Sequence, residues 1–190
     1  MSQPDVVSTS VHGAKRFQGM FTLIGVILAA FVIVYGASRV ETYADERRQI
    51  VLLLEHLEGL ANEQSALEWQ AVAEQNVSDE ISEERETAVQ AMAEALEELE
   101  QLEQRTLPFS TALGLASSYL AEVKELYQTY QTAVDEEFRH LAEGEFEEAE
   151  EIDEERVDPA FEALHEKVNT VTQSYSALAE RASNLAELAQ

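Results

Sequence analysis

The sequence predicts an all-α protein in which an N-terminal transmembrane helix continues into an antiparallel, up-down-up-down four-helix bundle. Three observations lead to this prediction. Glycine and proline, the main breakers of helices, number only seven and three in 190 residues. Near the start of the chain, residues 17–38 carry no charge. After this stretch, apolar residues recur at alternating spacings of three and four in four successive runs, which is typical of packed helices.

The first element is a membrane anchor over residues 17–38, preceded by a cytoplasmic tail over residues 1–16. As a helix, the anchor would be roughly 33 Å long, enough to cross a bilayer. A cleaved signal peptide is the alternative, but the apolar core is long for one and no small-x-small cleavage site follows. Lys15 and Arg16 favour a cytoplasmic tail, whereas Arg39 follows closely on the other side, so charge alone leaves the orientation open.

Four helices are then predicted over residues 39–75, 78–105, 110–142 and 145–190, with a kink near 158. Ser78 or Asp79 is a plausible N-cap of the second helix. Pro108, within a turn over 107–110, ends the second helix, Ser110 caps the third, and Gly144 ends it. The predicted core positions are Ile50, Leu53, Leu57, Leu60, Gln64, Leu67, Ala71; Ile81, Arg85, Ala88, Met92, Ala95, Leu99, Leu102; Leu113, Ala116, Leu120, Val123, Tyr127, Tyr130, Val134, Glu137, Leu141; and Val157, Phe161, Leu164, Val168, Val171, Tyr175, Leu178, Ala182, Leu185, Ala189.

Composition limits the possible partners. The chain has 38 acidic and 12 basic residues, a net charge of -26, which disfavours nucleic acid because phosphates would be repelled. A basic, metallic or amine-bearing ligand stays compatible with this charge. The absence of cysteine excludes disulfides and thiolate sites. Gln64, a polar residue in a core position, fixes helix register or dimer pairing, or is simply a buried amide with satisfied hydrogen bonds.

Two stretches resemble a known family. "LAEGEFEEAEEIDEERVDPAFEAL" looks like the bend between helices three and four in the four-helix-bundle sensory domain of methyl-accepting chemotaxis receptors. "ANEQSALEWQAVAEQNVSDE" is similar to the end of helix one in sensor modules attached to diguanylate cyclases and phosphodiesterases. The resemblance covers roughly residues 20–190. It implies a homodimer, a ligand pocket far from the membrane, and a second membrane helix leading to a cytoplasmic output domain.

The sequence departs from this family in two ways. It ends at "SNLAELAQ" in helical phase, without a second membrane span, which fits either the N-terminal piece of a longer receptor or a tethered sensor. No lysine or arginine lies between Arg48 and Arg85, so the family's amino-acid site is not carried over.

Four residues are candidates for ligand binding. Arg85, Arg139 and Arg156 lie at the predicted membrane-distal end and could hold an anionic ligand, or simply pair with neighbouring glutamates. Trp69, the only tryptophan, could line a pocket, or could instead anchor the core or a dimer interface.

A rival interpretation is a di-metal carboxylate enzyme. Glu137 with His140, and Glu162 with His165, form two Glu-x-x-His pairs of the kind that such bundles use. Measured from a bend at Gly144, however, the two pairs lie about 10 Å and about 27 Å along their helices, so they would not meet at one level. A separate helical cap between the pairs would relax this mismatch.

Two further features of the acidic bend have structural explanations. The run over 147–155 lacks the glycine and aspartate spacing of a calcium loop and reads as a solvated helix face. Asp158 and Pro159 suit an N-cap followed by the first position of a helix.

The residues therefore predict a protein that is not an enzyme and has no cofactor and no metal, since no nucleophile with a base, phosphate loop or zinc spacing is evident. By resemblance, the expected function is that of a membrane-anchored extracytoplasmic sensory module of a bacterial receptor. It would sit in the inner membrane as a single-pass homodimer and respond to a small ligand or a protein. The alternatives are a structural tether or adaptor that presents a helical surface, and the di-metal enzyme.

Overall fold

The computed structural model describes the backbone of residues 10–112 and 119–188. It describes their side chains except those of residues 10–35, 37, 107–112, 185, 186 and 188. Every regular element in these ranges is a helix, which confirms the all-α prediction. The elements are α1 (Ser10–Glu74), α2 (Asp79–Ala112), α3 (Leu120–Glu143), α4 (Phe146–Ile152), a π-helix η1 (Asp153–Val157) and α5 (Asp158–Leu188).

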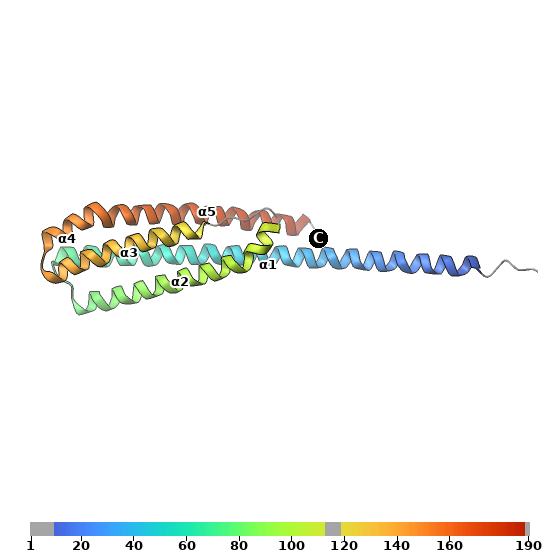
Figure 1. Cartoon of the computed structure of the whole chain (residues 1–190), viewed down its shortest axis with the longest axis horizontal. Coiled ribbons are helices and arrows are strands. Elements are labelled where there is room, and N and C mark those ends of the chain that lie inside the picture. Colours follow the sequence, from blue (N-terminus) through green and yellow to red (C-terminus); the bar gives the residue numbers. More distant parts are fainter. Residues whose placement is uncertain (1–9, 113–118, 189–190) are drawn as a thin grey trace, which may run out of the picture.

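Helices α1, α2, α3 and α5 lie side by side, and the first part of α1 extends well beyond the others (Figure 1). The chain reverses direction at residues 75–78 and again at Gly144, and both reversals lie at the same end of the molecule (Figure 1). We call this the distal end. The last turns of α5 lie at the opposite, proximal end, where α1 extends past its neighbours.

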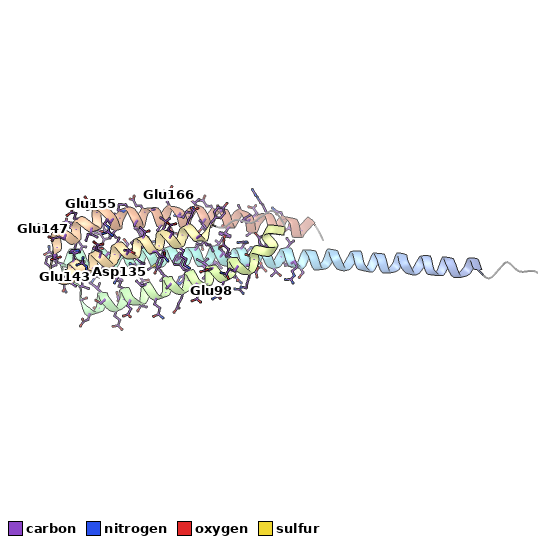
Figure 2. All side chains as sticks on the ribbon, viewed as in Figure 1. Glu98, Asp135, Glu143, Glu147, Glu155 and Glu166 are labelled. Carbon is purple, nitrogen blue, oxygen red and sulfur yellow. The ribbon has the colours of Figure 1, made fainter. Side chains whose placement is uncertain are left out.

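A large hydrophobic core runs between these helices, and a second, smaller cluster joins Tyr43 and Ala44 of α1 to Ala182 of α5. Leu57 of α1, Met92 of α2, Val134 of α3 and Val171 of α5 are all fully buried in the large core. Among the described core positions, most of the predicted apolar residues are buried and Leu53, Phe161 and Leu178 are partly buried against the large core. The predicted positions Leu113, Ala116, Leu185 and Ala189 lie outside the residues whose side chains are described. Acidic side chains cover the outer surface instead; Figure 2 labels Glu98, Asp135, Glu143, Glu147, Glu155 and Glu166.

The ends of two helices follow their sequence signals. The hydroxyl oxygen of Ser78 accepts a hydrogen bond from the backbone N–H of Ile81 at 3.2 Å, so Ser78 caps α2 as predicted. Gly144 ends α3 in the left-handed conformation, with φ of 80°. The N–H groups of Gly144 and Glu145 donate to the carbonyls of Leu141 and His140, at 3.2 and 2.9 Å, which is the Schellman arrangement.

The predicted turn at residues 107–110 is wrong. The backbone of α2 continues through Pro108 to Ala112, and α3 begins at Leu120 rather than at residue 110. Proline removes only one helical hydrogen bond and crowds the carbonyl four residues earlier, so a helix can bend at proline without ending there. Figure 1 shows the last turns of α2 bent away from the rest of the helix. The predicted cap Ser110 lies outside the described side chains.

The predicted N-cap at Asp158 is also wrong. The chain does not leave the helix there; it passes from α4 through the π-helix η1 into α5 without a break, and Asp158 is helical. The N–H of Asp158 donates to the carbonyl of Asp153, five residues earlier. Because Pro159 has no N–H and its ring crowds the preceding turn, a wider turn just before it relieves the clash. This turn stands at the kink predicted near residue 158.

The part of the chain that the structure describes contains no helix that combines the length and the apolarity needed to cross a membrane. The backbone of residues 17–38 forms part of α1, while the side chains of residues 17–35 and 37 lie outside the description. Of the predicted tail, residues 1–9 also lie outside it, and α1 begins at Ser10.

Candidate functional site

Three acidic side chains are buried together at the distal end. Glu68 of α1 is 3% exposed, Glu137 of α3 is 0% exposed and Asp153 of η1 is 7% exposed. Carboxyl groups are almost never buried this completely without a cationic partner, because losing water disfavours their charged form. We refer to Glu68, Glu137 and Asp153 as the distal carboxylate cluster.

Glu68 accepts one hydrogen bond from a neighbouring helix, α3, and one from its own helix, α1. Its Oε1 atom accepts one from the hydroxyl of Tyr130 at 2.7 Å and one from Nε2 of Gln64 at 3.3 Å. The Oε1 atom of Gln64 in turn accepts from Nε2 of Gln131 at 2.7 Å. Gln64 is therefore a buried amide with satisfied hydrogen bonds, one of the two interpretations that the sequence allowed.

Glu137 has no such partners. Both of its carboxyl oxygens are buried, and neither makes a hydrogen bond. Arg85 of α2 is the cation nearby, but its guanidinium pairs with the exposed Asp135 and lies 4.6 Å from the ring centroid of Phe138. A buried carboxyl group with two unpaired oxygens is costly in its charged form, so Glu137 favours the neutral form.

Burial, together with repulsion by nearby acidic groups, raises the pKa of all three carboxyl groups. Desolvation is the main cause for Glu68, whose pKa rises to about 7 although the bonds from Tyr130 and Gln64 act in the opposite direction. Desolvation, followed by the charges of Glu68 and Asp153, raises the pKa of Glu137 to about 8. Desolvation, followed by the charge of Asp158, raises the pKa of Asp153 to about 6.

The π-helix places Asp153 on the buried face. Buried residues in this segment follow the spacing Ala149, Asp153, Val157, Ala160 and Leu164, with two steps of four before a step of three. In a helix with 3.6 residues per turn, each step of four residues is longer than one turn, so two such steps would turn the side chains away from the core. The wider π-turn keeps these side chains on one face. π-Turns of this kind are frequent at functional sites.

A second buried polar group lies towards the proximal end. The guanidinium of Arg47 is fully buried and lies 4.8 Å and 4.9 Å from the ring centroids of Tyr43 and Tyr175. Its Nε, Nη1 and Nη2 atoms make no hydrogen bond among the described residues. The hydroxyl of Tyr175 donates to Oε1 of Glu103 at 2.7 Å. We refer to Tyr43, Arg47, Glu103 and Tyr175 as the proximal site.

The arginines predicted as ligand-binding residues each pair with an acidic side chain. Besides Arg85 with Asp135, Arg139 pairs with Glu143 on its own helix at 3.1 Å. Arg156 pairs with Glu136 of α3. Arg156 also lines a groove of about 620 Å³ between α3 and α5. Of these three arginines, Arg85 is the one whose charge acts on Glu68 and Glu137. Trp69 is 57% exposed on α1, directly after Glu68.

The residues of the di-metal interpretation are not gathered into one site. The Nδ1 atom of His140 lies 2.6 Å from Oε2 of Glu145, whereas the Nδ1 atom of His165 lies 3.1 Å from Oε1 of Glu58. Glu162 is exposed and Glu137 is buried elsewhere. In the described chain, the one trio with metal-binding geometry is His140, Glu143 and Glu145. A nitrogen of Arg139 lies 2.6 Å from Nε2 of this histidine, so the position next to the ring already holds a cation.

Sequence reasoning found part of the distal carboxylate cluster. Glu137 and Arg85 were identified as polar residues in core positions, but Glu68 and Asp153 were missed. Glu68 follows the core residue Leu67 and stands four residues after Gln64, a spacing that places two polar side chains on one helix face. That spacing was the available signal. Asp153 gave none, because its burial depends on the π-turn.

Comparison with known proteins adds no relative. No protein-family model matches the chain, and neither the curated proteins nor the solved structures contain a significant match.

Proposed function

We propose that this protein is a membrane-anchored sensory module of a bacterial signalling receptor, with its helical bundle outside the cytoplasm. One observation carries the proposal: a single uninterrupted helix of 65 residues, α1, includes both the uncharged segment 17–38 and Glu68 of the distal carboxylate cluster. A stimulus at the distal end would therefore act on the same helix that enters the lipid bilayer. The resemblance of the acidic bend to chemotaxis-receptor sensory domains points in the same direction.

The pairing of α1 with α5 supports a second route along the bundle. Arg48 of α1 donates a hydrogen bond to the hydroxyl of Ser183 at 2.7 Å. Further towards the distal end, Glu58 accepts one from Asn169 at 3.3 Å. Packed helices joined by such polar contacts can slide or rotate by small amounts, and a ligand or partner that prefers one packing selects it.

We also propose that the module is a homodimer. A groove of about 490 Å³ runs along α1 and α5, and Leu52, which lines it, is 64% exposed. A large exposed apolar side chain beside a groove suits contact with another helix. If Leu52 instead contacts a different protein, the bundle would serve as a tether or adaptor. Disulfide cross-linking of a Leu52→Cys variant in membranes distinguishes these functions. A covalent dimer of the chain supports the homodimer. A disulfide-linked adduct with a different protein, without a covalent dimer of the chain, supports the adaptor.

Anchoring and orientation can be tested in bacterial cells. We expect the full chain to stay in the membrane fraction after alkaline carbonate extraction. Leu28→Arg, in the middle of the uncharged segment, should release a large share of it, since a charge at the bilayer centre is costly. Leu52→Arg, outside that segment, is the matched control and should stay bound. Alkaline phosphatase fused after Gln190 should be active, because it folds only outside the cytoplasm. An extractable wild-type chain or an inactive fusion would contradict the proposal.

A further inference from the structure

The distal carboxylate cluster brings three acidic groups from three segments into one buried region. Glu68 comes from α1, Glu137 from α3 and Asp153 from η1, and each is at least nine-tenths buried. Glu137 is the decisive member, because both of its oxygens are buried without any hydrogen-bond partner. A native protein retains such an unsatisfied group only where the group is neutral or has a role.

Charged groups from every surrounding element act on the cluster, and most are negative. Asp158 of α5, Glu150 of α4 and Glu154 of η1 repel a charge on Asp153 or Glu137. The phenol of Tyr130 donates to Glu68 and carries no charge. Among the described residues, the positive group that acts on the cluster is Arg85 of α2, whose guanidinium pairs with the exposed Asp135. One shared cation cannot balance three buried carboxylates, so the packed arrangement requires bound protons.

We propose that the distal carboxylate cluster is a proton-binding site and that the proton is the stimulus to which the module responds. The second half of this statement rests on the proposed sensory function; the first half stands without it.

The response follows from the position of Asp153. α4 and η1 form a short segment that begins just after the left-handed residue Gly144 and packs against α1, α3 and α5. When the cluster loses protons, Asp153 and Glu137 carry like charges and repel each other. Exposure of Asp153 to solvent relieves this repulsion, and it requires movement of the short segment α4 and η1 rather than of the long helices. A segment with few buried residues and a π-turn opens at lower cost than the bundle core. Loss of protons therefore loosens α4 and η1, and α1 is released from them.

Protonation of each of the three groups stabilises the folded chain relative to the unfolded chain. Each carboxyl binds its proton more tightly in the folded chain than in the unfolded chain, where the ordinary pKa is 4.5 for the glutamates and 3.8 for the aspartate. The stability that the bound protons confer is complete below those ordinary values. It is lost as the pH rises through about 6, 7 and 8. The bundle should therefore be more stable in mild acid than in mild alkali.

Thermal unfolding of the full chain in lipid nanodiscs tests the proton site. Between pH 5.5 and 8.5 we expect the Tm of the wild-type protein to fall by about 5 °C or more. Glu137→Gln, which mimics the neutral acid, should remove at least half of this fall. Glu98→Gln, at an exposed acid of α2, is the matched control and should leave it unchanged. A wild-type Tm that does not change over this range, or equal slopes for the two variants, would overturn the proton site.

Two readouts cover the case in which Glu137→Gln does not fold. The fluorescence of Trp69, the only tryptophan and the neighbour of Glu68, should titrate in the wild-type protein with a midpoint between pH 6 and 8, whereas an unchanged spectrum would contradict the proposal. The same scans with added Ca²⁺ and with EDTA should superimpose. A Tm that rises with Ca²⁺ at fixed pH would replace the proton with a divalent cation as the ligand.

The stimulus is tested by cross-linking. The chain has no cysteine, so Glu58→Cys with Asn169→Cys reports the α1–α5 spacing specifically, because these two side chains touch. The rate of bismaleimide cross-linking in membranes should differ at least threefold between pH 6 and pH 8, and Glu137→Gln should remove the difference. A pH-dependent Tm with a constant cross-linking rate would leave the proton site standing and overturn the proton as stimulus. Failure of the membrane-anchoring experiment would overturn the sensory function, and with it the proton as stimulus, but would leave the proton site standing.

Discussion

The two buried polar groups of this bundle differ in the sign of their charge and in how that charge is balanced. At the distal end, Glu68, Glu137 and Asp153 bring three acids together with one cation that is shared with the surface. At the proximal site, Arg47 lies between the rings of Tyr43 and Tyr175. A guanidinium keeps its proton at any physiological pH and gains stabilisation from aromatic rings.

This contrast indicates which end of the helical bundle can respond to its surroundings. The proximal site has a fixed charge and a packing that depends on it at every pH. The distal carboxylate cluster has charges that protons can remove, so its packing depends on pH. The distal carboxylate cluster, whose packing depends on pH, lies at the distal end of the bundle. The proximal site lies towards the other end, where α1 and α5 continue together (Figure 1).

The largest expected effect comes from removing the fixed charge. Arg47→Ala takes a fully buried side chain from between two rings, so we expect the free energy of unfolding to fall by about 3 kcal/mol through the cavity and the lost cation–π contacts. The neighbouring Arg48→Ala, at an exposed side chain, should cost less than about 0.5 kcal/mol. Denaturant unfolding measures both. Equal losses for the two variants would show that Arg47 contributes nothing beyond an exposed arginine.

A matched pair of tyrosines compares the two regions directly. Tyr130 and Tyr175 each donate to a glutamate Oε1 atom at 2.7 Å. Tyr130→Phe should cost about 1 kcal/mol at pH 5.5 and about 2 kcal/mol at pH 8, because removing a bond that lowers the pKa of Glu68 further disfavours its charged form.

Tyr175→Phe loses its bond beside the positive charge of Arg47 instead of beside other acids. We expect a cost of about 1.5 kcal/mol that is the same at pH 5.5 and pH 8. Urea titrations at the two pH values measure the contrast. Parallel behaviour of the two phenylalanine variants would remove the distinction between the regions.

The turn that leads from α3 into α4 gives a smaller effect. Gly144→Ala introduces a side chain at φ of 80° and should cost about 1 kcal/mol, although nothing lies within 4 Å of the new methyl group. Gly59→Ala, inside α1 and equally unobstructed, should instead stabilise by about 0.5 kcal/mol. Thermal unfolding of the two variants should therefore give shifts of opposite sign, and shifts of the same sign would contradict the conformational explanation.

The smallest effect is expected at an exposed ion pair of the distal end. Arg139→Ala removes the pair with Glu143, and both side chains are about half exposed. Such pairs contribute less than about 0.5 kcal/mol. A loss above about 1 kcal/mol in chemical denaturation would indicate that the contact between Arg139 and His140 has a structural role of its own.

Sequence periodicity predicted much of the fold, because a seven-residue repeat of apolar side chains has few ways to be buried. The sequence located the core positions by their periodicity, and the cap at Ser78 and the end of α3 at Gly144 by residue type. It misplaced the end of α2, because whether proline ends or only bends a helix is decided by the packing of later residues.

The candidate site was predicted less well, for a physical reason. Glu137 and Arg85 occupy positions that the repeat reserves for apolar side chains, so they stood out. Asp153 lies in a run where most residues are acidic, and its burial depends on a local widening of the helix that the residue spacing does not predict.

The length of α1 has a mechanical consequence. With 65 residues at 1.5 Å each, this helix measures about 98 Å from Ser10 to Glu74. If it moves as a lever pivoting at Glu74, a tilt of only about one degree displaces the other tip by about 1.7 Å, as much as the whole helix shifts known from subunit interfaces. A small rearrangement close to Glu74 would therefore produce a much larger displacement at Ser10.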